Sequence, residues 1–365
     1  MKAEIFAIVF FAFCIGTYLV YTKHAQGGEP TSSMTVNDNK GNYENLRYRG
    51  RIELNEDDSQ IKSISPGGFF EFEKNGRKLS IQSDSKGRLS QIDSEGENKS
   101  SSGQTANLFL KEAVTELLAY GYDANDRIEK IARSGGDSAL LSQVDGLKLD
   151  NLKVMYINRV LQNDSLPLSI WPLVINKIGA LDADNDKEKL LFKVPVALLN
   201  QGAIAEPYFR VLGLISAADS RENLYVHIIS HAPVQDLVAS KVLDGVENLD
   251  GDFSKQKILE RMIATDSLAT RFLERFTAII GRMNDDQEKG KLLANLAERN
   301  ELTEAQKISI LRQTSTISSD EDRANLLLRM APRLGKSDSL KAAYLQAAKI
   351  ITDEAQYGRT VRAVE

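Results

Sequence analysis

A repeat of 34 residues in the C-terminal two thirds of the chain constrains its fold more than any other sequence feature. The pattern apolar-x-x-acidic-x-x-basic-x-x-apolar-apolar begins seven times without a gap, at Leu147, Leu181, Ile215, Leu249, Met283, Ile317 and Ile351. Each start lies 34 residues after the previous one, since 181 − 147 = 34 and every later difference is the same. A fixed period of this length is typical of small helical units that stack on one another.

The columns of the repeat predict a helix in the first half of each unit. Position 4 is acidic in every repeat except the third, which has Ala218, and position 7 is Lys153, Lys187, Arg221, Lys255, Lys289 and Arg323 in the six complete repeats. Positions 10, 11 and 14 are apolar, as in Leu292, Leu293 and Leu296, and they share a helical face with position 7. Position 2 is often Ser, Asp or Asn, which predicts the N-cap there.

A second apolar cluster at positions 28, 29 and 32 predicts a second helix, with Pro172 and Pro207 near its start. The predicted fold is therefore mainly α: a HEAT-like α/α two-helix solenoid of six repeats and twelve antiparallel helices over residues 147–350. A truncated seventh repeat follows over 351–365, and residues 105–146 are expected to form a divergent helical cap. A tetratricopeptide array of the same period is disfavoured because its signature residues are absent, and the only tryptophan, Trp171, lies in a second helix.

Residues 48–95 alternate polar and apolar side chains, which predicts a small antiparallel β meander of five strands. The strands are expected near 51–54, 60–64, 70–73, 78–81 and 89–92. Asn75-Gly76 predicts a tight hairpin turn, because a type I′ turn needs positive φ at both central residues. A module of this size buries little apolar surface by itself. We therefore expect the apolar face of the sheet to pack on the first helices that follow the linker at 96–104.

The segment Ile5–Tyr21 is seventeen residues without a charge, flanked by Lys2 and Lys23. This length predicts an N-terminal apolar helix over residues 1–25 that serves as a membrane anchor or a cleaved signal peptide, with Ala25-Gln26-Gly27 as the cleavage site; a buried core helix is a third alternative. Lipidation at Cys14 is disfavoured because bulky Phe13 precedes it. Residues 26–47 are rich in Gly, Ser, Thr, Asn and Asp and are expected to form a flexible tether. The C-terminal part is expected to lie outside the cytoplasm.

No residue pattern predicts a catalytic, cofactor or metal site. The net charge of −5 disfavours nucleic acid as a partner, and a single cysteine excludes an intrachain disulfide. His227 and His231 have a chelating spacing but no evident third ligand, so surface histidines are the favoured interpretation. Asp57-Asp58 and the acidic run 182–186 lack the spacing of a calcium loop, and Pro66-Gly67-Gly68 lacks the lysine and helix of a phosphate loop. The basic column at position 7 is expected to form ion pairs, with anion or peptide binding as the alternative.

Two stretches carry a resemblance to a known family. These are 50–54 (GRIEL) followed by 61–70 (IKSISPGGFF), and the repeat start Ile317-Ser318-Ser319-Asp320. Together they resemble the extracytoplasmic tails of bacterial membrane sensor proteins of the antirepressor metallopeptidase type. The resemblance implies a bacterial envelope protein that senses or scaffolds a partner. It does not imply peptidase activity, because the chain has no His-Glu-x-x-His motif.

The expected function is that of a non-enzymatic envelope protein that binds a protein or peptide partner through its repeat surface. The alternative is an extracytoplasmic sensor or regulatory module that couples ligand binding to a membrane partner. A partner-binding scaffold predicts a continuous exposed stripe of charged or aromatic residues, whereas a sensor predicts a closed pocket.

Overall fold

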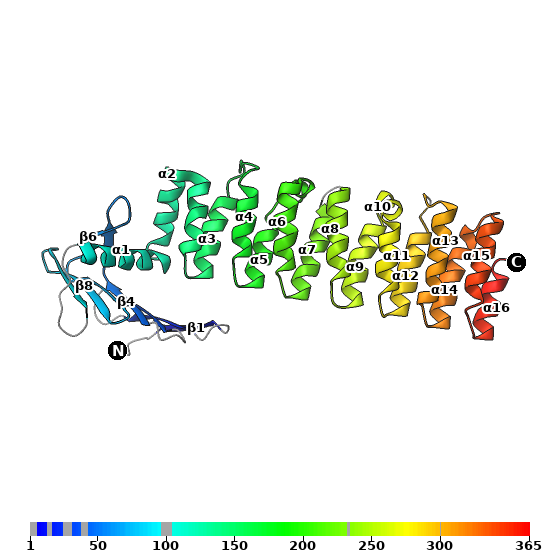
Figure 1. The fold of residues 1–365 in the computed structure, drawn as a ribbon, viewed down its shortest axis with the longest axis horizontal. Helices are drawn as coiled ribbons and strands as arrows, with labels where there is room; N and C mark the ends of the chain where they lie inside the picture. Colours follow the sequence, from blue (N-terminus) through cyan, green and yellow to red (C-terminus); the bar gives the residue numbers. More distant parts are fainter. Residues whose placement is uncertain are drawn as a thin grey trace. The chain divides into compact units, whose positions relative to one another are not determined.

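The computed structural model describes residues 6–12, 17–24, 31–37, 43–95, 104–231, 234–299 and 301–365. The chain divides into two compact units, which are treated separately below. The N-terminal unit comprises Met1–Gly136 and Asp145–Lys153, and the C-terminal unit comprises Asp137–Val144 and Val154–Glu365. Figure 1 shows a β-sheet in the first and a row of helices in the second.

The N-terminal unit contains an antiparallel sheet with the strand order β1-β2-β3-β4-β7-β8-β9 and a separate hairpin, β5-β6. The strands are β1 (Phe6–Ala12), β2 (Thr17–His24), β3 (Thr31–Asn37), β4 (Tyr43–Arg49), β5 (Ile52–Leu54), β6 (Ile61–Ile64), β7 (Phe69–Lys74), β8 (Arg77–Ser83) and β9 (Leu89–Glu95). The five strands expected within 48–95 are all present, and Asn75 and Gly76 have φ of 50° and 81° in the β7–β8 turn. They do not form one simple meander, because β4 pairs with β7 and leaves β5 and β6 as an inserted hairpin.

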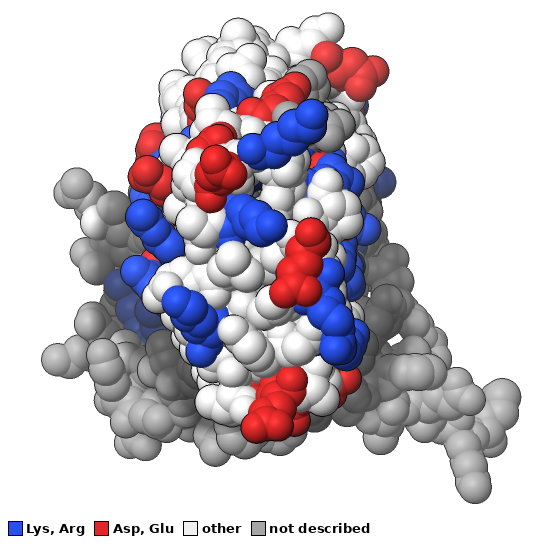
Figure 2. Space-filling view, turned by 90° about the vertical axis from the view of Figure 1, so that its right-hand side faces the viewer, with Lys and Arg blue, Asp and Glu red and all other residues white. Residues whose placement is uncertain are grey.

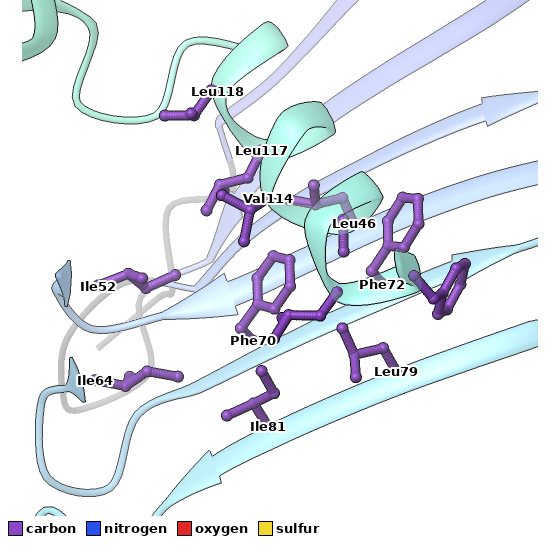
Figure 3. Close-up of a cluster of buried hydrophobic side chains, with 13 residues drawn as sticks. Leu46, Ile52, Ile64, Phe70, Phe72, Leu79, Ile81, Val114, Leu117 and Leu118 are labelled. Atoms are coloured by element: carbon purple, nitrogen blue, oxygen red, sulfur yellow. The ribbon is translucent and has the colours of Figure 1, made fainter. Parts of the chain in front are cut away.

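Helix α1 (Gln104–Ala119) covers the apolar face of this sheet. Its residues at positions 109, 110, 113, 114, 117 and 118 recur at helical spacing and pack on side chains from β4 to β8 (Figure 3). Phe70, Phe72 and Leu79 are fully buried in this core. The expectation that the sheet packs on the helix after the linker is thereby confirmed. The expected cap over residues 105–146 includes α1, which belongs to the N-terminal unit.

The first forty-seven residues differ most from the sequence-based expectation. The predicted apolar helix is not confirmed, since Phe6–Ala12 and Thr17–His24 are strands that pair in antiparallel register. The predicted tether is wrong over β3 and β4, where Ser32, Met34 and Leu46 are buried. The prediction failed because β3 is rich in Ser and Thr, which occur in strands as well as in flexible linkers. Residues 25–30, 38–42 and 96–103, which include the proposed cleavage site and most of the linker, lie outside the described residues.

The C-terminal unit consists of paired helices. The first helices of successive repeats are α3 (Asp150–Leu161), α5 (Asp184–Leu191), α7 (Ala218–His231), α9 (Asp252–Ile263), α12 (Asp286–Ala297), α14 (Asp320–Met330) and α16 (Glu354–Arg362). Their starts are again 34 residues apart, at position 4 of each repeat. The second helices are α4 (Trp171–Gly179), α6 (Gly202–Gly213), α8 (Asp236–Glu247), α10 (Asp266–Arg271) with α11 (Leu273–Gly281), α13 (Glu304–Arg312) and α15 (Asp338–Ala348).

From α5 to α16, each first helix packs on the first helix of the next repeat, and second helices also pack on one another, as α13 does with α15. Figure 1 shows the two sets side by side along this unit. The core is formed by the predicted columns, and Leu292, Leu293 and Leu296 at positions 10, 11 and 14 are fully buried. Part of helix α2 (Ala124–Gln143) also belongs here, where Leu140 and Leu141 are buried.

The helices begin one residue later than the N-cap expectation placed them. The N-cap is at position 3, and Asp285, Ser319 and Asp353 each accept a hydrogen bond from the backbone three residues on. The residue at position 2 is not the N-cap; its backbone N–H donates to the position-4 aspartate of the preceding repeat, as Ser318 does to Asp286. Within the described residues, no helix combines the length and apolar character that crossing a membrane requires.

Candidate functional site

The recurring charges at positions 4 and 7 form a series of hydrogen bonds and ion pairs between successive repeats, which we call the ladder; the bonds from one repeat to the next are its rungs. In Asp286, Oδ1 accepts from Lys289 Nζ at 3.0 Å, while Oδ2 accepts from the backbone N–H groups of Ser318 and Ser319 at 2.8 and 2.9 Å. Lys289 Nζ also donates to the carbonyl of Thr316 at 2.7 Å. The same carboxylate-to-backbone bonds recur from Asp184, Asp252 and Asp320 to the repeat that follows each of them.

These groups have a structural role. The side chains of Lys187, Lys289 and Arg323 are 7–8% exposed, so they are not available to a partner. Burial is the largest single influence on the pKa of Asp184 and Asp286 and raises it, but the hydrogen bonds and the paired lysine together lower it below the ordinary value. The hydrogen bond from Thr352 is the main cause of the lowered pKa of Asp320. The expected ion pair within the repeat is present at Lys153, Lys187, Lys289 and Arg323. Anion binding is disfavoured at Lys187, Lys289 and Arg323, because these three are buried and paired.

The ladder is interrupted at the third repeat, where Ala218 replaces the aspartate. Within the described residues, no group hydrogen-bonds to the buried Nε of Arg221, and its nearest acidic partner is Asp250 at 3.8 Å. The following N-cap, Gly251, has φ of 83°, whereas Ala183 and Asp285 at the same position have φ of −77° and −79°. Without a carboxylate to hold its backbone N–H, this turn adopts a conformation that favours glycine.

The exposed face of the first helices carries a different set of columns, at positions 9 and 13, which we call the first-helix stripe. No residue of the stripe is buried, none is acidic, and seven are Lys or Arg. The stripe consists of Met155, Arg159, Lys189, Lys193, Asn223, His227, Lys257, Arg261, Lys291, Asn295, Asn325 and Arg329. Adjacent repeats are linked along it, for example by Arg329 to Asn295 at 3.0 Å.

The least compensated part of the stripe lies on α5, α7 and α9. The stripe residues Lys189, Lys193, His227 and Arg261, together with the adjacent Phe192 at position 12, are called the basic patch below. Within the described residues, Lys189 and Arg261 have no hydrogen bond or ion pair, and Lys193 binds only the neutral Asn158, at 2.5 Å. Phe192 meets the His227 ring edge-on, with centroids 4.9 Å apart. This patch combines positive charge with an exposed aromatic ring.

The histidine pair does not form a metal site. The ring centroids of His227 and His231 lie 4.3 Å apart with the planes tilted by 35°, and His231 Nδ1 lies 2.9 Å from the carbonyl oxygen of His227. Burial, and then His231, lower the pKa of His227. No group of three possible metal-binding side chains occurs among the described residues, which include the acidic run 182–186.

The other sequence candidates are structural turns or ion pairs. Gly67 has φ of 75° and its carbonyl accepts from Arg49 at 2.6 Å, so Pro66-Gly67-Gly68 is a turn. Asp57 accepts from Ser59, which lowers its pKa, and Asp58 pairs with Lys130 at 2.8 Å. Neither feature converges on a ligand.

Two features were not anticipated from the sequence. A hollow of about 420 Å³ lies between α10, α11 and α13, where the second helix of the fourth repeat breaks at Phe272. The arginines that line it, Arg271 and Arg275, are paired with Asp236 and Asp244 of α8. In the N-terminal unit, the carboxyl groups of Glu44 and Glu116 meet beside Lys74 and Tyr120. No sequence signal marks either feature, because each joins residues far apart in the chain.

Comparisons with protein-family models and with curated proteins gave no match for this chain. Figure 2 shows the end of the molecule nearest the C-terminus, where basic and acidic side chains alternate with uncharged ones and neither sign forms a continuous patch. The first-helix stripe is therefore the candidate site.

Proposed function

We propose that this chain is a non-enzymatic scaffold that binds a protein or peptide partner on the first-helix stripe of a HEAT-like α/α solenoid. The observation that carries the proposal is the division of charge within each repeat. At position 7, Lys187, Lys289 and Arg323 are buried and pair with half-buried aspartates at position 4 that bind the next repeat, whereas no residue at positions 9 and 13 is buried. Extended repeat surfaces of this kind are suited to partner recognition.

Photo-cross-linking tests which face is used. A photoreactive residue at Asn223 or Asn325, both on the stripe, is expected to cross-link to a discrete partner in intact cells. The same residue at Ala342 or Gln346, exposed on α15, is the control. Equal cross-linking from both faces, or cross-linking from α15 alone, contradicts the proposal.

We further propose that the protein is exported to the bacterial envelope, on the basis of the uncharged segment Ile5–Tyr21. Protease added to spheroplasts is expected to digest the repeats, and protection of the repeats in the cytosol contradicts export. Mass spectrometry of the mature N-terminus separates the two forms of the proposal. A start at Gly28 indicates a cleaved signal, and a start at Met1 indicates an anchor.

A sensor or regulatory role is the second candidate, and one observation favours it. Glu44 and Glu116 are largely buried carboxyl groups that interact across the sheet–helix boundary, and burial followed by Glu116 raises the pKa of Glu44. Perturbed groups of this kind are enriched at functional sites, although ion-pair networks also produce them. A sensor requires a conformational response to its signal, and weaker docking of α1 when Glu44 loses its proton is such a response.

A further inference from the structure

The basic patch differs from the neighbouring basic residues of the stripe in having no ion pair within the described residues. Lys257 pairs with Glu222, Lys291 with Glu260 at 2.7 Å, and Arg329 with Glu298 at 2.7 Å. On α5, the acidic residue next to the stripe is Glu188, and its carboxylate already accepts from Ser220 and Asn223 of the next repeat. Lys189 and Lys193 therefore present positive charge that no ion pair within the described residues offsets, and Arg261 adds a third positive charge, which acts on Glu222 without forming an ion pair with it.

An aromatic side chain lies among these charges. Phe192 is 36% exposed, and its ring is held by the edge-on contact with His227 of the next repeat. A large apolar side chain at the centre of a charged surface contributes binding energy that the charges alone do not, because aromatic anchors carry much of the energy of protein interfaces. A ligand that matches this patch has both acidic and apolar groups.

From these contacts we infer that the basic patch binds an acidic, extended segment of the partner protein, with an apolar residue of that segment against Phe192. This inference rests on the proposed partner-binding function. The three helices that carry the patch are successive neighbours, and two helix-to-helix steps of about 8–10 Å span roughly 16–20 Å. At about 3.3 Å per residue, five or six extended residues cover that distance.

A peptide fits the patch better than a nucleic acid or an anionic bilayer does. Those ligands require a broad basic field, whereas this chain has a net charge of −5 and acidic residues such as Glu188 and Glu260 lie beside the stripe. The uncompensated charge is local and involves three helices. A short acidic segment matches its extent.

The test measures binding of a labelled acidic peptide of about ten residues, made of Glu, Asp and Gly with one central Leu, to the full chain. Reversing three charges in K189E/K193E/R261E is expected to weaken binding by about tenfold to hundredfold, since each exposed pair contributes up to about 1 kcal/mol. The matched control R312E/K341E/K349E reverses three exposed charges on the second-helix side. It is expected to bind like the wild type. Phe192→Ala is expected to remove the preference for Leu over Ser in the peptide.

Three results overturn the inference: equal weakening in both triple variants, tighter binding of a short DNA duplex or of anionic phospholipid vesicles than of the peptide, and no peptide binding by the wild type at low salt. The cross-linking experiment separates this failure from that of the proposed function. If cross-links from Asn223 to a native partner persist in K189E/K193E/R261E, the stripe binds a partner and only the acidic segment is wrong. Circular dichroism confirms that each variant is folded.

Discussion

Two carboxyl groups from distant parts of the chain, Glu44 on β4 and Glu116 on α1, face each other in the N-terminal unit. Their side chains are 13% and 11% exposed. Lys74 Nζ lies 3.8 Å from Glu44 and 3.7 Å from Glu116, and Lys148 Nζ lies 3.4 Å from Glu116. Burial raises the pKa of Glu44 most, followed by repulsion from Glu116, and burial likewise raises the pKa of the nearby Tyr120 hydroxyl.

The raised pKa of Glu44 predicts that the docking of α1 weakens as the pH rises. A carboxyl group with a raised folded-state pKa binds its proton more tightly in the folded state. Its stabilising contribution is therefore present at acidic pH and is lost between its ordinary pKa of 4.5 and the raised value. Glu44→Gln is expected to flatten this dependence, which hydrogen exchange of the α1 amides measures. Glu112→Gln, which removes an exposed partner of Lys74, is the control and is expected to retain the slope.

Burial also decides how costly the loss of a lysine is. The sequence alone predicts that Lys289→Ala costs under about 1 kcal/mol if its pairing is exposed, but Lys289 is 5% exposed. Its removal leaves the Thr316 carbonyl without this donor, so we now expect a loss of about 1–3 kcal/mol. Leu292→Ala is expected to cost about 2–5 kcal/mol. Urea denaturation gives both values.

The exposed neighbour Lys291 is the matched control for Lys289. Its pair with Glu260 is 47% and 32% exposed, so Lys291→Ala is expected to cost less than about 1 kcal/mol. If Lys289→Ala is no more destabilising than Lys291→Ala, the ladder does not contribute to stability in the way its geometry implies.

At the level of single elements, the start of α9 shows how two positions in different repeats depend on each other. Ala218 provides no carboxylate, and Gly251 takes the positive φ that the unheld turn adopts. The double change Ala218→Asp with Gly251→Ser provides a carboxylate for the backbone N–H groups of residues 250 and 251 and a serine N-cap for α9. We expect it to raise the free energy of unfolding by about 0.5–2 kcal/mol, as N-caps and charge-assisted bonds do.

The single changes test the coupling. Gly251→Ser alone is expected to lower the free energy of unfolding, because a serine is strained at a φ of 83°. Without a carboxylate at residue 218, nothing favours the negative φ that serine prefers. Ala218→Asp alone is expected to gain less than in the double variant. Thermal unfolding of the four proteins completes a double-mutant cycle, and strictly additive effects rule out the dependence between the two turns.

Elements with strong periodicity were predictable from sequence, and those that depend on distant contacts were not. The 34-residue register anticipates where Asp184, Asp252 and Asp286 begin their helices, because each helix repeats the same local capping and burial pattern. In contrast, the sequence predicts a tether where β3 forms, since only the pairing of β3 with β4 reveals that Met34 faces a core. The Glu44–Glu116 pair, 72 residues apart, has no local signal at all.

The candidate site was only half predictable. The column of His227, Arg261 and Arg329 is polar in the sequence, and in the structure Arg261 and Arg329 are exposed whereas His227 is half-buried. What separates Lys189 from Lys257 is the presence of Glu222 beside the latter, a contact between repeats. Periodicity identifies the face of a helix, whereas its uncompensated charge depends on the neighbouring helix.

At the scale of the whole molecule, a chain whose repeats are bonded in a fixed register tolerates the loss of one complete repeat. Deleting residues 283–316 removes α12 and α13 and brings Ser318 and Ser319 to the positions that Asn284 and Asp285 occupied. Their backbone N–H groups can then donate to Asp252, because the same two positions donate in each rung. The core columns at positions 10, 11 and 14 remain aligned.

We expect the deletion of 283–316 to leave a folded protein with an unchanged helical signal per residue in circular dichroism and a cooperative thermal transition. Deleting only 283–299, which removes α12 and leaves α13 out of register, is expected to broaden or abolish that transition. Because the basic patch lies on α5, α7 and α9, the whole-repeat deletion is also expected to bind the acidic peptide like the wild type. If both deletions unfold the protein equally, its stability does not depend on contacts between neighbouring repeats. If the whole-repeat deletion folds but no longer binds the peptide, the binding surface extends to α12 or α13, beyond the patch.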